Sequence, residues 1–145
     1  MKKLLLFSFL FVAAFGFAQK NQPQSIISSK VAIKKYHNKE ELSKMQKGEL
    51  LNLYIERIES LVQTLPYIAF ATKPGKTMST YGIPNTKENR KTLEDKVDAT
   101  DEFLETTLEF QKKMLPYSDK SNLIAAILFY EESMKLLHEY SEFQE

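Results

Sequence analysis

Residues 85–116 read NTKENRKTLEDKVDATDEFLETTLEFQKKMLP and contain the clearest helical pattern in the chain. Asn85 and Glu88 have the spacing of a capping box, in which each side chain bonds the backbone N–H of the other residue. Apolar residues then recur at helical steps and form one stripe, which consists of Leu93, Val97, Leu104, Leu108 and Leu115, widened by Phe103, Phe110 and Met114. Pro116 cannot continue the helix. This stretch predicts one long amphipathic helix.

A second helical pattern precedes it. Asn38 and Glu41 repeat the capping-box spacing, and Pro66 ends or kinks the helix because it has no backbone N–H to donate. The apolar face between them comprises Leu42, Met45, Leu51, Tyr54, Ile55, Ile58, Leu61, Val62 and Leu65. Gly48 interrupts this helix at a cost of about 1 kcal/mol relative to alanine.

A third pattern follows, for which Ser118 or Asp119 can supply the cap. Its apolar face has the widest arc of the three and comprises Leu123, Ile124, Ile127, Leu128, Tyr130, Met134, Leu137 and Tyr140. We therefore expect this helix to be the most enclosed. Only a few residues join it to the preceding helix, which favours an antiparallel pair.

These patterns predict an all-α fold: an up-down-up bundle of three long amphipathic helices, with a long ordered connection between the first and the second. Each apolar stripe has to pack against another, because isolated helices gain too little from propensity alone. The helical-bundle domain is expected over residues 38–145, preceded by a mobile N-terminal segment at residues 19–37. Within that segment, Val31, Ile33 and Tyr36 can dock loosely on the domain.

Residues 1–18 have the pattern of a cleaved signal peptide. Lys2 and Lys3 precede an apolar run at residues 4–17, and small residues flank Phe17 before a cleavage site after Ala18. The run is shorter than the ~20 residues that span a bilayer, so no stable membrane span is expected after cleavage. The chain has no cysteine, which in an exported protein favours a bacterial envelope. We expect a periplasmic or secreted protein.

Composition excludes several functional classes. Lys and Arg number 20 against 19 Asp and Glu, so the chain lacks the basic excess of a nucleic-acid-binding protein. Thiol chemistry is excluded because there is no cysteine. Gly75-Lys76-Thr77 resembles the end of a phosphate-binding loop, but Phe70 stands where that motif requires glycine, so a turn is the better interpretation.

The two histidines give no metal or haem site. Lys135 stands three residues before His138, so the Glu-x-x-His motif of di-iron bundles is missing, and His37 lies at a helix boundary. Met45 and His138 would lie at opposite ends of the bundle, about 30 Å apart by helix rise, which is too far to ligate one haem. A structural or exposed role is expected for both histidines. An acidic stripe of Asp98, Glu102, Glu105 and Glu109 is interpreted as a solvated helix face. No catalytic residue, metal site or cofactor is predicted.

Residues 66–86 form a connection much longer than the two to eight residues usual between packed helices. The segment is too apolar for a solvated linker, and Gly75 and Gly82 lie in turn sequences that favour a positive φ. It can be an ordered cap over one end of the bundle, a recognition surface, or a short helix or strand through residues 67–71. As a recognition surface it would use Tyr67, Phe70, Tyr81 and Ile83.

The leading hypothesis is a non-enzymatic binding or interaction module that contacts a protein or a small molecule through residues 66–86. The alternative is a structural or self-assembling envelope protein whose exposed helix faces pair with copies of itself. An enzyme, or a haem-binding or metal-binding bundle, is the third possibility, and no motif supports it.

Overall fold

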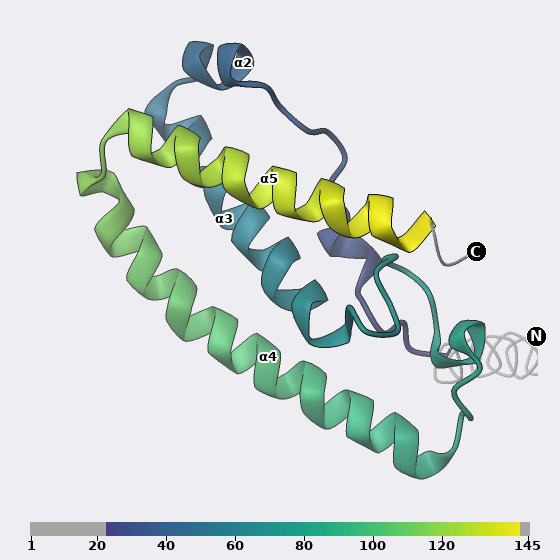
Figure 1. Ribbon diagram of the computed structural model, residues 1–145. Coiled ribbons are helices and arrows are strands. Elements are labelled where there is room, and N and C mark those ends of the chain that lie inside the picture. Colours follow the sequence, from purple (N-terminus) through teal and green to yellow (C-terminus); the bar gives the residue numbers. More distant parts are fainter. Residues whose placement is uncertain (1–22, 143–145) are drawn as a thin grey trace, which may run out of the picture.

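The computed structural model of the chain describes residues 23–142 and is all-α, as the sequence predicts (Figure 1). Within these residues the four α-helices are α2 (Lys39–Lys44), α3 (Lys47–Thr64), α4 (Lys87–Met114) and α5 (Lys120–Glu142). Short 3-10 helices lie between them, namely η2 (Ser29–Val31), η3 (Leu65–Tyr67), η4 (Met78–Tyr81) and η5 (Leu115–Tyr117). The expected signal peptide lies outside the described residues. No helix within residues 23–142 has the length and apolar character needed to cross a membrane.

The segment that the sequence predicts as the first long helix forms two helices, α2 and α3. The capping box of Asn38 and Glu41 is confirmed and starts α2, which ends after six residues. Met45 then has extended backbone, and the carboxylate of Glu49 accepts a hydrogen bond of 2.7 Å from the backbone N–H of Gln46. This second N-terminal cap starts α3, so the chain restarts the helix instead of continuing it.

The expected up-down-up bundle of three helices is not confirmed, because the described residues contain four α-helices. α3 packs against both α4 and α5, whereas α4 and α5 diverge from η5 and make little contact with each other within the described residues (Figure 1). The expectation that α4 and α5 pack against each other as an antiparallel pair is therefore wrong. A short connection fixes the direction of a chain, but here α3 fills the space between the two helices.

α4 begins one residue later than the sequence pattern indicates. The side chain of Thr86, and not that of Asn85, caps the helix by accepting a hydrogen bond of 3.1 Å from the backbone N–H of Asn89. The stripe of α4 is also narrower than expected. Leu104 and Leu108 are buried, but the three residues expected to widen the stripe have exposed fractions of 56%, 59% and 51% at Phe103, Phe110 and Met114. α4 packs one face against α3, and no second helix of the described part of the chain covers these three side chains.

Most of the buried apolar residues form two clusters. The loop cluster joins the N-terminal segment, the 66–86 connection and the start of α4 through Ile26, Ile27, Tyr67, Ala71, Met78 and Leu93. The helix cluster joins α2, α3 and α5 through Leu42, Leu50, Tyr54, Leu123, Ile124 and Ile127. α3 also buries polar side chains at Arg57, Ser60 and Thr64, positions that the expected apolar stripe does not include.

The N-terminal segment packs against the rest of the protein from residue 23 onward. The sequence indicates loose docking through Val31, Ile33 and Tyr36, but Ile26 and Ile27 are the buried residues. The backbone N–H of Ile26 donates to the carbonyl of Lys76, and the N–H of Gly75 donates to the carbonyl of Ile27, both at 2.8 Å. The segment is thereby paired with the long connection and forms one side of the loop cluster.

Candidate ligand site

The 66–86 connection is an ordered cap built from turns and 3-10 helices. Pro66 lies in η3, and the carbonyl of Tyr67 then accepts hydrogen bonds from the N–H groups of Phe70 and Ala71. Gly75 and Gly82 have φ angles of 79° and 69°, which glycine adopts without steric cost. The positive φ that the sequence favours at these two turns is confirmed.

An apolar cavity of about 310 Å³ lies between this cap and the N-terminal half of α4. The buried side chains of Ile26, Tyr67, Met78 and Leu93 surround it, and the half-exposed ring of Phe70 lies beside them. Its remaining lining residues are Pro66, Ile83, Asn89, Thr92 and Lys96. A largely apolar cavity with a few polar groups on one side is the usual form of a small-molecule site.

Three of the four residues that the sequence proposes for recognition line this cavity, namely Tyr67, Phe70 and Ile83. Tyr81 does not line it and packs against the loop cluster from a partly buried position. The rings of Tyr67 and Phe70 meet edge to face, with centroids 6.0 Å apart. Tyr67 is thus a wall of the cavity as well as part of the core.

The sequence does not predict the lining residues that come from outside the connection. Ile26 lies in the segment that the sequence indicates as mobile, and Lys96 lies on α4, where the sequence pattern indicates only an apolar stripe. The adjacent pair Ile26-Ile27 in an otherwise polar stretch is the one signal that could have indicated burial. Asn89, Leu93 and Lys96 share one face of α4, since they are four and three residues apart.

A larger cavity of about 480 Å³ adjoins the first one and shares Ile26 and Tyr67 with it. Charged residues line this second cavity at Lys30, Glu59 and Asp101. Burial raises the pKa of the Tyr67 hydroxyl, and the charge of Asp101 raises it further, so the phenol stays neutral at physiological pH. Because both signs of charge are present around it, the lining of this cavity does not favour one sign of ligand charge.

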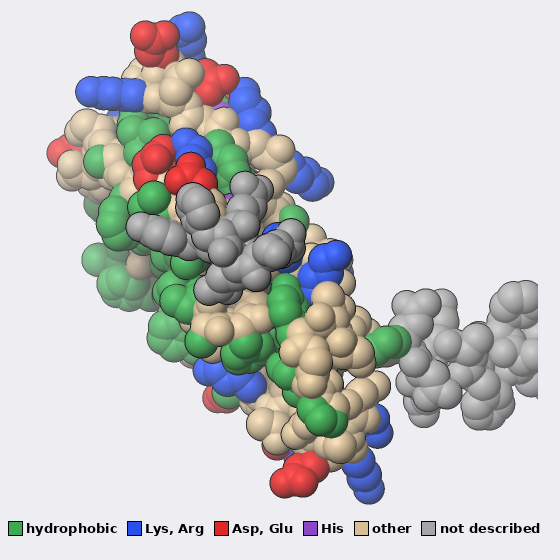
Figure 2. All heavy atoms as spheres, turned by 45° about the vertical axis from the view of Figure 1, so that its right-hand side comes forward, with side chains coloured by type: hydrophobic (Ala, Val, Ile, Leu, Met, Phe, Trp, Pro, Cys, Tyr) green, Lys and Arg blue, Asp and Glu red, His purple; other side chains and the backbone are tan. Residues whose placement is uncertain are grey.

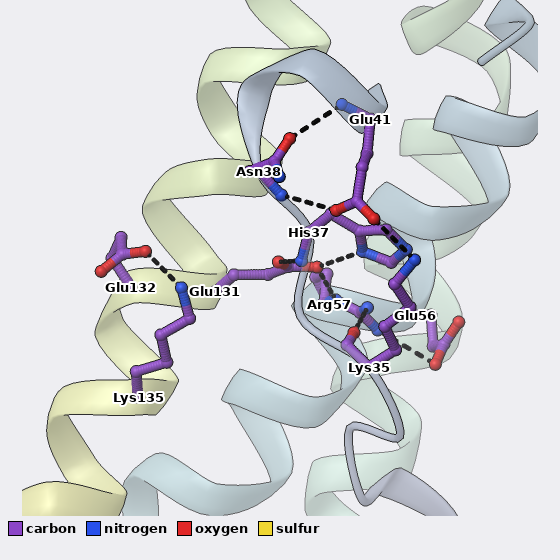
Figure 3. A network of polar contacts seen from close by, with 9 residues as sticks. All are labelled: Lys35, His37, Asn38, Glu41, Glu56, Arg57, Glu131, Glu132 and Lys135. Carbon is purple, nitrogen blue, oxygen red and sulfur yellow. Dashed lines mark hydrogen bonds and ion pairs between the residues drawn. The ribbon is translucent and has the colours of Figure 1, made fainter. Parts of the chain in front are cut away.

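A buried polar network lies at the contact of α3, α5 and the N-terminal segment (Figure 3). The carboxylate of Glu131 accepts hydrogen bonds from Nε of Arg57 at 2.8 Å, from Nδ1 of His37 at 2.9 Å and from the backbone N–H of His37. Arg57 also donates to the carbonyl of Lys35 at 2.7 Å. The exposed fractions of Glu131 and Arg57 are 0% and 2%. These contacts hold residues 35–37 against α3 and α5.

The network supports a structural role and not a catalytic one. Among the described residues, every buried side-chain nitrogen and oxygen atom has a hydrogen-bond partner. Burial raises the pKa of Glu131, but the hydrogen bonds from His37 and Arg57 together lower it by more. The pKa of Glu131 therefore lies below its ordinary value. The carboxylate therefore stays ionised and fully engaged, with no position for a substrate. His138 also lies at this contact, where its Nδ1 is 3.2 Å from the hydroxyl of Tyr36.

No group of three or more potential metal-ligating side chains occurs within residues 23–139. No family model matches the chain, and no curated protein or solved structure is significantly similar to it. A function for this protein has to be inferred from the geometry of its own residues.

Proposed function

We propose that this protein is a non-enzymatic binding module whose site is the apolar cavity beneath the 66–86 cap. The supporting observation is that Tyr67, Phe70 and Ile83, which the sequence marks as candidate contacts, border a cavity of about 310 Å³. Cavities of this size suit small ligands, and their apolar walls provide most of the binding free energy. The cap is held on two sides, by the N-terminal segment and by α4, so little conformational entropy is lost on binding.

Export to the periplasm or the cell exterior belongs to the same proposal. It depends on the pattern of residues 1–18, which lie outside the described residues. A module of this kind would bind its ligand outside the cytoplasm.

Binding can be tested with N-phenyl-1-naphthylamine, a neutral apolar probe whose fluorescence rises when it leaves water. We expect saturable binding of one probe per chain. The matched pair of variants is Phe70→Ala and Ile68→Ala, because these side chains have similar exposed fractions of 44% and 43% but only Phe70 lines the cavity. Burying a full Phe side chain contributes about 1.5–3 kcal/mol, so the half-exposed Phe70 should contribute about 1 kcal/mol, or about fivefold in affinity.

The expected result is a roughly fivefold weaker dissociation constant for Phe70→Ala and an unchanged one for Ile68→Ala. Thr92→Trp, which adds bulk at an exposed lining position, should abolish binding while the melting temperature stays the same. Equal affinity in all three variants, or no saturable binding by the original chain, would contradict the proposal.

A second candidate function is self-association through the exposed helix faces. Phe103 and Phe110 are seven residues apart on α4 and Met114 follows four residues later, which is the spacing by which helices pair in coiled coils. In the view of Figure 2, exposed hydrophobic side chains gather along the left-hand side of the molecule. Sedimentation velocity tests this candidate. A dimer that dissociates in a Phe103→Glu/Phe110→Glu variant would support it, and a monomer at millimolar concentration would exclude it.

A further inference from the structure

The polar residues of the apolar cavity all come from one helix. Asn89, Thr92 and Lys96 belong to α4, whereas the residues from the cap and the N-terminal segment are apolar apart from the hydroxyl of Tyr67. The amide nitrogen of Asn89 donates to the carbonyl of Pro84 at 2.8 Å, which fixes this side chain at the start of α4. A ligand in the cavity therefore meets apolar walls on most sides and a polar edge on one.

The charge at this edge is positive. None of the ten lining residues is acidic, and Lys96 is their one charged side chain. Lys96 is exposed and has no ion-pair partner among the described side chains, whereas Lys91 on the same helix is paired with Asp95 at 2.8 Å. A cation beside an apolar cavity favours a ligand with an apolar body and a negatively charged end.

The volume limits the apolar body. An apolar protein cavity of about 150 Å³ accommodates benzene, which has six carbon atoms. By that scale, about 310 Å³ accommodates roughly twelve carbon atoms. A straight chain of about eight to twelve carbon atoms suits this space.

We propose that the cavity binds a single-chain amphiphile with an anionic head group, of which a medium-chain carboxylate is the simplest form. The chain would lie against Met78 and Leu93, and the carboxylate would lie at the edge formed by Lys96 and Asn89. This assignment rests on the proposed binding function and adds the class of ligand to it.

Displacement of the bound fluorescent probe by three ligands with the same ten-carbon chain tests the assignment. These ligands are decanoate, decan-1-ol and decyltrimethylammonium, each used below its critical micelle concentration. We expect decanoate to displace the probe at the lowest concentration and decyltrimethylammonium at the highest. The preference for decanoate should shrink as salt is raised, because the charge of Lys96 is exposed to solvent.

The variant that isolates the charge is Lys96→Met, which keeps an unbranched side chain and removes the ammonium group. It should weaken decanoate about three- to tenfold and leave decan-1-ol unchanged, since an exposed cation contributes modestly. Lys113→Met is the control, because it removes the same charge from the same helix about 25 Å away by helix rise. Decanoate should bind this control as well as it binds the original chain.

The failures of the two proposals are distinguishable. If the probe binds but decanoate and decan-1-ol displace it equally, or if Lys96→Met weakens both alike, the anionic ligand class is wrong and the binding site stands. If the probe binds and no ten-carbon ligand displaces it, the ligand is not a single-chain amphiphile, and an apolar side chain of a protein partner becomes the better occupant. If the probe itself does not bind, the proposed function fails.

Discussion

Replacing Glu131 by glutamine should destabilise the protein far more than the same change at its neighbour Glu132. Glu131 is completely buried and its carboxylate accepts three hydrogen bonds, two from His37 and one from Arg57. A glutamine can accept at one oxygen only, and its NH₂ group would face a donor. Arg57 would then lose its buried counter-charge and keep only Glu56, whose side chain is 57% exposed, at 3.0 Å. Breaking a buried ion pair costs about 3–5 kcal/mol. That is a large share of the ~5–15 kcal/mol by which domains are stable.

Urea denaturation followed by circular dichroism measures this cost. With an m-value of about 2 kcal/mol/M, Glu131→Gln should lower the midpoint by about 1.5–2.5 M. The control is Glu132→Gln, because the side chain of Glu132 is 61% exposed and pairs only with Lys135 on the surface. Exposed pairs contribute about 0–1 kcal/mol, so this midpoint should hardly move. Equal midpoints for the two variants would refute the reasoning that the network stabilises the fold.

The same prediction has a pH dependence. The pKa of Glu131 is lower in the folded chain than its ordinary value of 4.5, because the hydrogen bonds from His37 and Arg57 outweigh the effect of burial. The ionised carboxylate thus stabilises the fold above about pH 4.5, and this stabilisation is lost as the pH falls through the folded-state pKa. The stability difference between the original chain and Glu131→Gln should shrink as the pH falls below 4.5.

Three further substitutions test the assignment of buried faces and caps. Leu104→Asp should abolish cooperative thermal unfolding, because Leu104 is 4% exposed and a buried carboxylate costs several kcal/mol, whereas Phe103→Asp at a residue 56% exposed should still melt cooperatively. Thr86→Ala should lower the free energy of unfolding by about 1 kcal/mol through loss of the cap of α4, and a larger loss in Asn85→Ala would return the cap to Asn85. Gly82→Ala should cost about 1–2 kcal/mol, because its φ of 69° is strained for alanine, and an unchanged denaturation midpoint would contradict this conformation.

Much of the site could be predicted because its chemistry is local in sequence. The excess length and apolar character of residues 66–86 marked Tyr67, Phe70 and Ile83 before any geometry was known. The rest of the lining could not be predicted, because Ile26 and Lys96 approach the cap only through long-range packing. The spacing of apolar residues indicates that a helix face is buried, but it does not indicate which other segment of the chain covers that face.

The buried faces of the helices could likewise be predicted only in part. The steps of three and four on α4 identified Leu104 and Leu108 correctly, and they failed at Phe103 and Phe110 because apolar residues can also stay exposed. On α3, the pattern could not reveal that Arg57 is buried. A charged side chain enters the core only when a distant partner such as Glu131 compensates its lost hydration.

The sequence by itself determined the all-α class, the cap of α2 and the two glycine turns, since these depend on interactions between residues a few positions apart. Only the tertiary structure decided that α3 separates α4 from α5, that the N-terminal segment completes the loop cluster, and that a cavity remains beneath the cap. The physical reason is that local hydrogen bonds and φ preferences are set within one or two turns of chain. The burial of a stripe depends instead on which other surface it meets, and several surfaces of this chain are apolar enough to compete for it.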